Sequence, residues 1–320
     1  MAYHIVNNDV VEISTDFVES IFNEYLPKQS IVINNTSDIE YLYQSQIKFH
    51  YVFFNSCTNP VNVEQQIKDI DIKYNFYVLT GLYKYHTHLI PDDRIKYFPF
   101  WAVWMSCQNY QFSSDLKKYK ISCLNGIPRE HRKLVYLKLQ EKDYFSDMIF
   151  TFGHRPGLHQ NFDKWSLTDQ EHAAFKRLPQ HVEFLPSDRD GIDVTVDHPA
   201  FQETYVNLVT ETTVRADTPM LSEKTFKPIA TGQLFVLIAS PGAIQFLRDI
   251  GFDTFDDIID HSYDQILDIR TRIEQTLVQI DRLAYMDLAS ICDTIKLRLI
   301  KNSEYLRSSA FRDQFILNFG

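Results

Sequence analysis

Short, uninterrupted apolar runs, separated by stretches long enough for a helix, constrain this chain more than any other feature. In the first hundred residues such runs, rich in Val, Ile, Phe and Tyr, occupy 30–34, 51–55 and 76–80. Strands that are apolar at every residue suit a parallel sheet covered on both faces. The stretches between them, 37–46 and 61–70, each have room for a crossover helix. This part of the chain is predicted to form βαβ units in one sheet.

The same alternation begins again after residue 117. Strands are expected at 118–124, 148–152, 182–185, 205–210 and 233–239. Helices are expected at 128–140, from near Ser222, from near Pro241, and over 264–317, where apolar residues recur every three or four positions. Residues 153–180 lack a clear period and are interpreted as a long connection.

Two successive blocks of this kind predict an α/β fold. In it two Rossmann-like, doubly wound domains face a cleft, and C-terminal helices close the chain. A length of 320 residues agrees with two domains. We expect an N-terminal domain over 1–112 and a C-terminal domain with its helices over 113–320. Ligands of such sheets bind at the carboxyl ends of the strands.

Composition excludes several classes of protein. With 44% hydrophobic residues, 9 Gly and 12 Pro, the chain is neither disordered nor fibrous. A formal charge of −10 disfavours general nucleic-acid binding, which would need a local basic patch. The cysteines are far apart and predict neither a disulfide framework nor a zinc ribbon; they are Cys57, Cys107, Cys123 and Cys292. No leader pattern or membrane span is recognised, so we expect a soluble, cytoplasmic protein, in the host cytoplasm if it is viral.

The turn after the strand at 118–124 has the features of an anion site. It begins with Asn125 and Gly126 and leads into a helix whose first turn carries Arg129 and Arg132. Free N–H groups and the dipole at a helix start favour a phosphate, and arginines three residues apart can hold its oxygens. Alone, the segment fits a basic, solvated helix face equally well.

A second polar group follows the strand at 205–210. Glu211 comes directly after the strand, and Ser222, a good N-cap, opens a helix with Glu223, Lys224 and Thr225. A lysine at the positive end of a helix is unfavourable without an anion, so Lys224 indicates a phosphate partner. Glu223 can accept hydrogen bonds from a ribose diol. The pair matches the two polar parts of a sugar nucleotide, and an ordinary exposed Glu–Lys pair is the alternative.

These residues carry a resemblance to a known family. The strand ending in Glu211, the loop after it, the Ser222–Thr225 segment and the apolar run 232–238 resemble the donor-binding signature of α1,3-fucosyltransferases and related GT-B glycosyltransferases, including exostosin-like and phage-encoded ones. The run 247–264 is similar to the segment after that signature in viral and bacterial relatives. The resemblance covers residues 118–270 and extends only weakly into the first domain.

The resemblance implies a GT-B fold, with the acceptor domain over 1–112 and the nucleotide-sugar donor domain over 113–320. It also implies a transferase that moves a sugar from a nucleotide-diphosphate sugar to an acceptor hydroxyl, with inversion and without a metal. Glu223 would hold the donor ribose, Lys224 and either Arg129 or Arg132 the pyrophosphate, and Glu211 the sugar or nucleotide side of the cleft. No cofactor is expected, because the sugar nucleotide is a substrate. The acceptor would be a glycan, a protein or a modified DNA base.

The first domain departs from the family pattern. The family is expected to place an acidic residue near the end of a first-domain strand, but residues 82–85 contain no carboxylate. His86 and His88 titrate in a suitable range and are the candidates for a catalytic base, although two histidines on a loop are more often bystanders. Neither this pair nor the Asp188-x-Asp190 sequence predicts a metal site.

Two further functions stay open. The basic segment 117–138 allows a phage-type DNA-modifying glycosyltransferase acting on a flipped-out hydroxymethylated base, which the net charge opposes. The absence of a carboxylate after Gly81 allows a catalytically inactive protein that binds a sugar nucleotide or a glycan. Hydrolysis of the donor would separate an active enzyme from such a protein.

Overall fold

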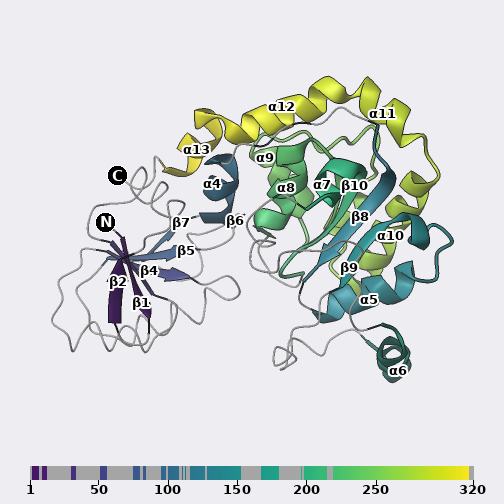
Figure 1. Cartoon of the computed structure of the whole chain (residues 1–320), viewed down its shortest axis with the longest axis horizontal. Helices are drawn as coiled ribbons and strands as arrows, with labels where there is room; N and C mark the ends of the chain where they lie inside the picture. Colours follow the sequence, from purple (N-terminus) through teal and green to yellow (C-terminus); the bar gives the residue numbers. More distant parts are fainter. Residues whose placement is uncertain are drawn as a thin grey trace. The chain divides into compact units, whose positions relative to one another are not determined.

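The computed structural model divides into two compact units, each with its own sheet (Figure 1). Residues 1–108 and 308–320 form the first unit, and residues 109–307 form the second. The expected domain ranges, 1–112 and 113–320, place the boundary slightly later and keep residues 308–320 with the second domain. The structure describes residues 2–6, 9–12, 30–33, 51–55, 75–79, 82–83, 95–98, 100–107, 110, 112, 116–126, 128–152, 167–179, 196, 198–214 and 219–316.

The first unit contains a six-stranded sheet in the order β2-β1-β3-β4-β5-β7. Its strands are β1 (Ala2–Val6), β2 (Asp9–Glu12), β3 (Ser30–Ile33), β4 (Tyr51–Asn55), β5 (Asn75–Leu79) and β7 (Ile95–Phe98). Strands β1 and β2 form an antiparallel pair, and the other neighbours are parallel. The predicted strands of this region are β3, β4 and β5 and are confirmed.

Strands β1, β2 and β7 were not expected. Two of them lie at the edges of the sheet, where a strand pairs on one side only and needs less apolar sequence. The other elements among the described residues of this unit are β6 (Leu82–Tyr83), α4 (Phe100–Cys107) and α13 (Ser309–Ile316). Arg312 of α13 donates to the Ser106 carbonyl of α4 at 3.3 Å. The helices expected at 37–46 and 61–70 lie outside the described residues.

The second unit contains a fully parallel, four-stranded sheet in the order β12-β10-β8-β9. Its strands are β8 (Tyr119–Asn125), β9 (Ile149–Phe152), β10 (Thr204–Thr210) and β12 (Leu234–Ile238). They confirm four of the five strands expected here, and the fifth, at 182–185, lies outside the described residues. The short strand β11 (Met220–Leu221) follows β10 in the chain. Together the two sheets confirm the predicted α/β class.

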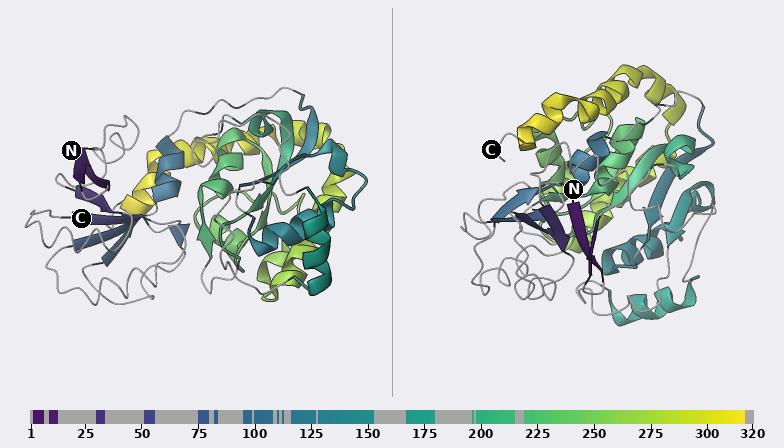
Figure 2. Two further views of the ribbon diagram at one scale, coloured as in Figure 1. Left: turned by 60° about the horizontal axis from the view of Figure 1, so that its bottom comes forward. Right: turned by 60° about the vertical axis from the view of Figure 1, so that its left-hand side comes forward.

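Helices of the second unit cover its sheet (Figure 1, Figure 2). They are α5 (Glu130–Leu139), α6 (Asp169–Arg177), α7 (Ala200–Glu203), α8 (Glu223–Thr231), α9 (Ala243–Asp249), α10 (Ile269–Ala284), α11 (Leu288–Thr294) and α12 (Lys296–Arg307), with 3-10 turns at Phe145–Asp147 and Ser262–Gln265. The helical pattern expected over 264–317 is divided among α10 to α13.

Helix α6 corrects the expectation of a long connection over 153–180. Thr168 and Glu171 form a capping box, in which each side chain accepts from the backbone N–H of the other residue. Phe175 is the buried residue of α6, and its ring packs against those of Tyr136 and Phe152. Because Phe175 is the one large apolar residue of this helix, the sequence shows no clear helical period of apolar residues.

The core of the second unit holds its strand ends in place. All five residues of β12 are buried, and both α8 and α10 pack against this strand. Helix α12 lies alongside α8, where Ser303 donates to the Ala230 carbonyl at 2.6 Å. Burial of this kind fixes the start of α8 relative to the sheet.

The strand order reverses between β8 and β10. From β8 the chain first reaches β9 on one side and then returns to add β10 and β12 on the other. In the first unit the parallel strands β1, β3, β4, β5 and β7 follow one another in chain order. A reversal opens a crevice outside the carboxyl ends of the two strands, where doubly wound sheets bind their ligands.

Candidate functional site

The two motifs singled out in the sequence meet at this carboxyl edge. Asn125 ends β8, and Thr210, which ends β10, donates from its hydroxyl to the Asn125 side-chain oxygen at 2.5 Å. Arg132, in the first turn of α5, donates to the backbone carbonyls of Thr210 at 2.9 Å and Glu211 at 3.4 Å. The start of α5 is thereby attached to the end of the neighbouring strand.

Glu211 lies at the centre of the arrangement and is 0% exposed. Its Oε1 accepts from the Ser222 N–H at 2.8 Å and the Thr225 hydroxyl at 2.6 Å. Its Oε2 accepts from the Ser222 hydroxyl at 2.6 Å and the Thr212 N–H at 2.9 Å. One carboxylate therefore connects the end of β10 to the first turn of α8 through four internal hydrogen bonds.

The first turn of α8 presents a buried anion and a more accessible cation. Ser222 caps the helix by accepting from the Lys224 N–H at 3.3 Å. Glu223 is 4% exposed and forms an ion pair with Lys224, whose side chain is 28% exposed and also donates to the Thr212 hydroxyl. Burial alone would raise the pKa of Glu223, but the ammonium groups of Lys224 and Lys227 hold that pKa below its usual value. Glu223 is therefore ionised at neutral pH.

The start of α5 carries two arginines, Arg129 and Arg132, together with the buried Glu130. Arg132 is buried, and burial together with the neighbouring Arg129 lowers its pKa to about 10, which leaves it charged at neutral pH. His131 is also buried, and burial together with Arg132 lowers its pKa well below the usual value. A neutral His131 lies 2.9 Å from the Glu211 carbonyl and donates to it through Nε2. Two guanidinium groups that disfavour each other's charge would be stabilised by an anion.

Three helices that follow strands of this sheet differ in how their starts are capped. Asp264 accepts from the Ile244 and Gln245 N–H groups at the start of α9, at 3.0 and 3.1 Å. Ser222 caps α8, whereas the side chain of Arg129, the N-cap residue of α5, accepts no hydrogen bond from its helix. Beside the start of α5, a Cβ added at Gly126 would meet no atom within 4 Å. The start of α5 is the one of these three that carries two arginines, which favours an anion there.

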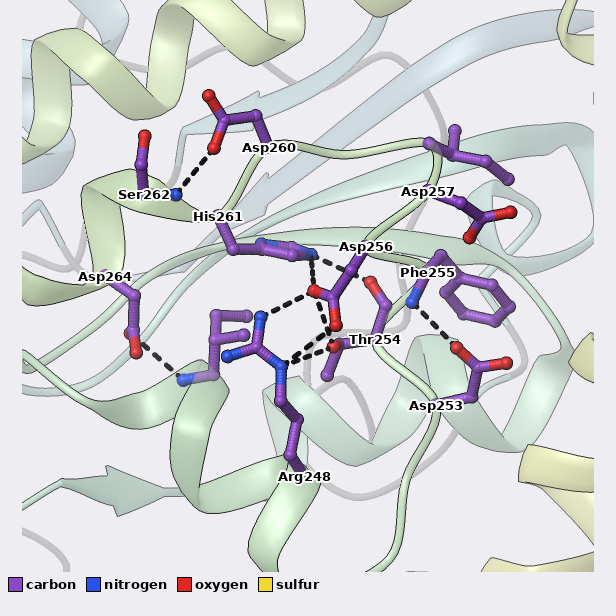
Figure 3. A network of polar contacts seen from close by, with 12 residues as sticks. Arg248, Asp253, Thr254, Phe255, Asp256, Asp257, Asp260, His261, Ser262 and Asp264 are labelled. Carbon is purple, nitrogen blue, oxygen red and sulfur yellow. Dashed lines mark hydrogen bonds and ion pairs between the residues drawn. The ribbon is translucent and has the colours of Figure 1, made fainter.

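Residues of the run 247–264 form a polar network that begins at Arg248 of α9 (Figure 3). Arg248 pairs with Asp256 and also donates to the Thr254 hydroxyl at 3.1 Å. His261 lies 2.8 Å from the Thr254 carbonyl through Nε2 and 2.9 Å from the Tyr263 hydroxyl through Nδ1. Because a carbonyl only accepts, Nε2 carries the hydrogen and Nδ1 accepts from Tyr263. These contacts hold the loop that carries Asp264.

Three lysines of the predicted basic segment have different neighbours. Lys120 donates to backbone carbonyls at the end of α10, at 2.7 and 3.1 Å. Lys138 pairs with Glu274 at 3.5 Å, and Lys133 lies over the Phe175 ring. These lysines make separate contacts within the second unit.

The structure leaves part of the predicted site unplaced. His86, His88, Asp188 and Asp190 lie outside the described residues. Within the described part of the chain, no group of three or more His, Cys, Asp or Glu side chains is arranged to hold a metal ion. None of the described helices is long and apolar enough to cross a bilayer.

Sequence reasoning missed His131, Thr210 and Thr212. Their contacts are with the backbone of Glu211 or with side chains more than ten residues away. The position of His131 between the two arginines was the one signal available for it in the sequence.

No protein-family model matches the chain, and no curated protein matches it. Among solved structures, the chain is similar to the DNA-modifying enzyme β-glucosyltransferase, crystallised with and without its substrate uridine diphosphoglucose. The TM-score is 0.46 at 13% identity, over 97% of this chain and 85% of that one. It is also similar to T4 phage BGT in complex with UDP and Mn2+, with a TM-score of 0.44 at 13% identity, over 93% of this chain and 84% of that one. Likeness at this level assigns neither a family nor an activity.

Proposed function

We propose that the protein is a GT-B glycosyltransferase that transfers a sugar from a nucleotide-diphosphate sugar to an acceptor hydroxyl. One observation carries the proposal. At the reversal point of the parallel sheet, a helix start with two arginines lies next to a helix start that bears an ionised carboxylate and an accessible lysine. Cations for a diphosphate and a carboxylate for a ribose are the groups that such a donor requires.

The diphosphate is assigned to the start of α5 and to Lys224. Arg129 is partly exposed and would contact the phosphate oxygens, whereas the buried Arg132 would act through its charge and by holding α5 against β10. These cations and the helix N–H groups would neutralise charge that develops on the departing nucleoside diphosphate. Because these groups would neutralise the charge of the leaving group, the proposed transfer uses neither a resident cofactor nor a metal ion.

The ribose is assigned to Glu223, and Glu211 is assigned a positioning role. The Glu223 carboxylate is ionised and bonded to a lysine that a diphosphate would attract. Glu211 already accepts four internal hydrogen bonds, so it would orient Ser222, Glu223 and Lys224 without touching the donor. His86 and His88 remain the candidates for the base that activates the acceptor.

A thermal-shift panel tests the donor assignment. Uridine, guanosine and adenosine diphosphate sugars are compared with free pyrophosphate and with the sugars alone. A ligand that binds only the folded state raises the unfolding midpoint by mass action, so at least one sugar nucleotide should do so. Stabilisation by none of them would refute the donor site.

Matched variants localise the binding. Lys224→Gln removes the cation at the proposed site, and Lys142→Gln removes the cation of a remote, similarly exposed pair with Asp281. The shift should shrink in Lys224→Gln and persist in Lys142→Gln. Equal shifts in both variants would place the ligand elsewhere.

Donor turnover distinguishes an enzyme from a binding protein. An active transferase should hydrolyse the donor slowly, giving free sugar and nucleoside diphosphate. It should release the nucleoside diphosphate faster when the correct acceptor takes the sugar. Acceptors to compare are glycans, a protein and a hydroxymethylated DNA duplex. Stabilisation by a sugar nucleotide without any turnover would favour the inactive binding protein.

A further inference from the structure

A cavity of about 320 Å³ lies at the opposite, amino-terminal edge of the four-stranded sheet. Thr204 and Tyr205, the first residues of β10, form one wall, and α11 and α12 contribute others. The seven residues of β10 separate this cavity from Glu211 by about 20 Å, at roughly 3.3 Å per residue. It is therefore distinct from the proposed donor site.

The polar lining of the cavity is mostly positive or hydrogen-donating. The ammonium-bearing residues Lys117 and Lys296 line it, opposed by the single carboxylate of Asp293. Lys296 forms no ion pair within the described residues. The Tyr205 hydroxyl accepts from the Lys117 N–H at 3.0 Å, so its own hydrogen can be donated to a ligand.

The rest of the lining is apolar. Phe112, Leu116 and Leu299 contribute walls of the cavity. Leu116 is 83% exposed. Large apolar side chains gathered around a concave site mark a surface that binds a ligand or a partner.

We propose that this cavity binds a small organic anion with an apolar body. The acidic head group would lie between Lys117 and Lys296, and the body would pack against Phe112 and Leu299. The volume is at the lower end of ligand pockets, which span roughly 300–1,000 Å³, and therefore suits a small molecule rather than a peptide. The inference is independent of the glycosyltransferase proposal, because it uses none of the same residues.

The fluorescent probe 8-anilinonaphthalene-1-sulfonate has this chemistry and serves as the test ligand. The full-length protein should bind it saturably, and excess uridine diphosphate should not displace it. Lys296→Gln should weaken binding at least several-fold, and Ala289→Phe should abolish it by filling the cavity. Lys301→Gln, on the exposed side of the same helix and outside the cavity, should leave it unchanged.

Alkylation of Cys292 tests the proposal without a variant. Cys292 lines the cavity, and burial raises the pKa of its thiol to about 11, so its alkylation is slow. Cys107 is exposed and serves as the control. The probe should slow alkylation of Cys292 by iodoacetamide at least several-fold and leave Cys107 unaffected, as followed by mass spectrometry of the two peptides. Unslowed alkylation of Cys292, displacement by uridine diphosphate, or equal affinity in Lys296→Gln and Lys301→Gln would each overturn the proposal.

Discussion

The two glutamates of the candidate site are stabilised by different means. Glu211 is stabilised by four hydrogen bonds from neutral donors, whereas Glu223 is stabilised by the charges of Lys224 and Lys227. Neutral donors favour a fixed geometry, and a charge pair can be exchanged for another charged group. This difference is why we assign Glu211 to positioning and Glu223 to the ligand.

Glu211→Gln tests the positioning role. In glutamine one of the two carboxylate oxygens is replaced by an NH2 group, which donates rather than accepts. Two of the four donors therefore lose their acceptor. We expect the free energy of unfolding to fall by about 1–3 kcal/mol. Urea denaturation measures this loss, with Glu141→Gln, at an exposed position, as the control. Unchanged stability would mean that the four bonds contribute nothing.

Lys224→Gln tests the charge pair through its pH dependence. The pKa of Glu223 is lowered in the folded protein, so its contribution to stability is present above the unfolded pKa of about 4.3 and is lost as pH falls below that value. Without Lys224 the pKa is lowered less, and less stability is lost on acidification. Urea denaturation at pH 7 and pH 4 should therefore show a smaller drop in Lys224→Gln than in the wild type. An equal drop would contradict the electrostatic account.

At the scale of elements, the start of α5, with its two arginines, is the feature that most favours an anion. Arg129→Gln should weaken binding of pyrophosphate and of sugar nucleotides by roughly 1–3 kcal/mol, the range for a charge-assisted hydrogen bond. Lys133→Gln, in the same helix but beyond its first turn, should bind as the wild type does. Calorimetric titration of both variants checks this, and equal losses in the two would indicate only a general effect of charge.

Helix α6 is held by one aromatic anchor and by the ion pair between Glu171 and Arg270, whose closest contact is 2.6 Å. This pair, together with hydrogen bonds from Thr168, lowers the pKa of Glu171 to about 2. Glu171→Gln should therefore speed hydrogen exchange in α6 and leave that of β10 and β12 unchanged. Exchange that stays slow in α6 would show that Phe175 alone holds the helix.

The sequence predicted all four strands of the second sheet and the Ser222 cap, but not the edge strands of the first sheet or the capping of α9. Strands β4 and β12 are apolar at nearly every residue, and such a pattern has few other structures to adopt. The proximity of Arg132 to Glu211 followed from parallel strands, whose carboxyl ends share one edge. By contrast, the capping of α9 by Asp264 and the four bonds of Glu211 depend on how loops return to the sheet, which no local pattern encodes.

At the scale of the whole molecule, the chain has a formal charge of −10 but places several cations together at one edge of one sheet. This arrangement favours a small anionic substrate over a polyanion, because the electrostatic potential is positive near these cations while the net charge of the chain repels a polyanion. The central claim is that this edge binds the diphosphate and the ribose through different residues.

Calorimetric titration of Glu223→Gln tests that claim most directly. The substitution keeps the size of the side chain, removes its charge and releases Lys224 from the ion pair. The ligands compared are the sugar nucleotide that most stabilises the wild type and inorganic pyrophosphate, which lacks a ribose. The account predicts that the sugar nucleotide binds at least several-fold more weakly, while pyrophosphate binds at least as well as before. Unchanged affinity for the sugar nucleotide, or an equal loss for pyrophosphate, would contradict it.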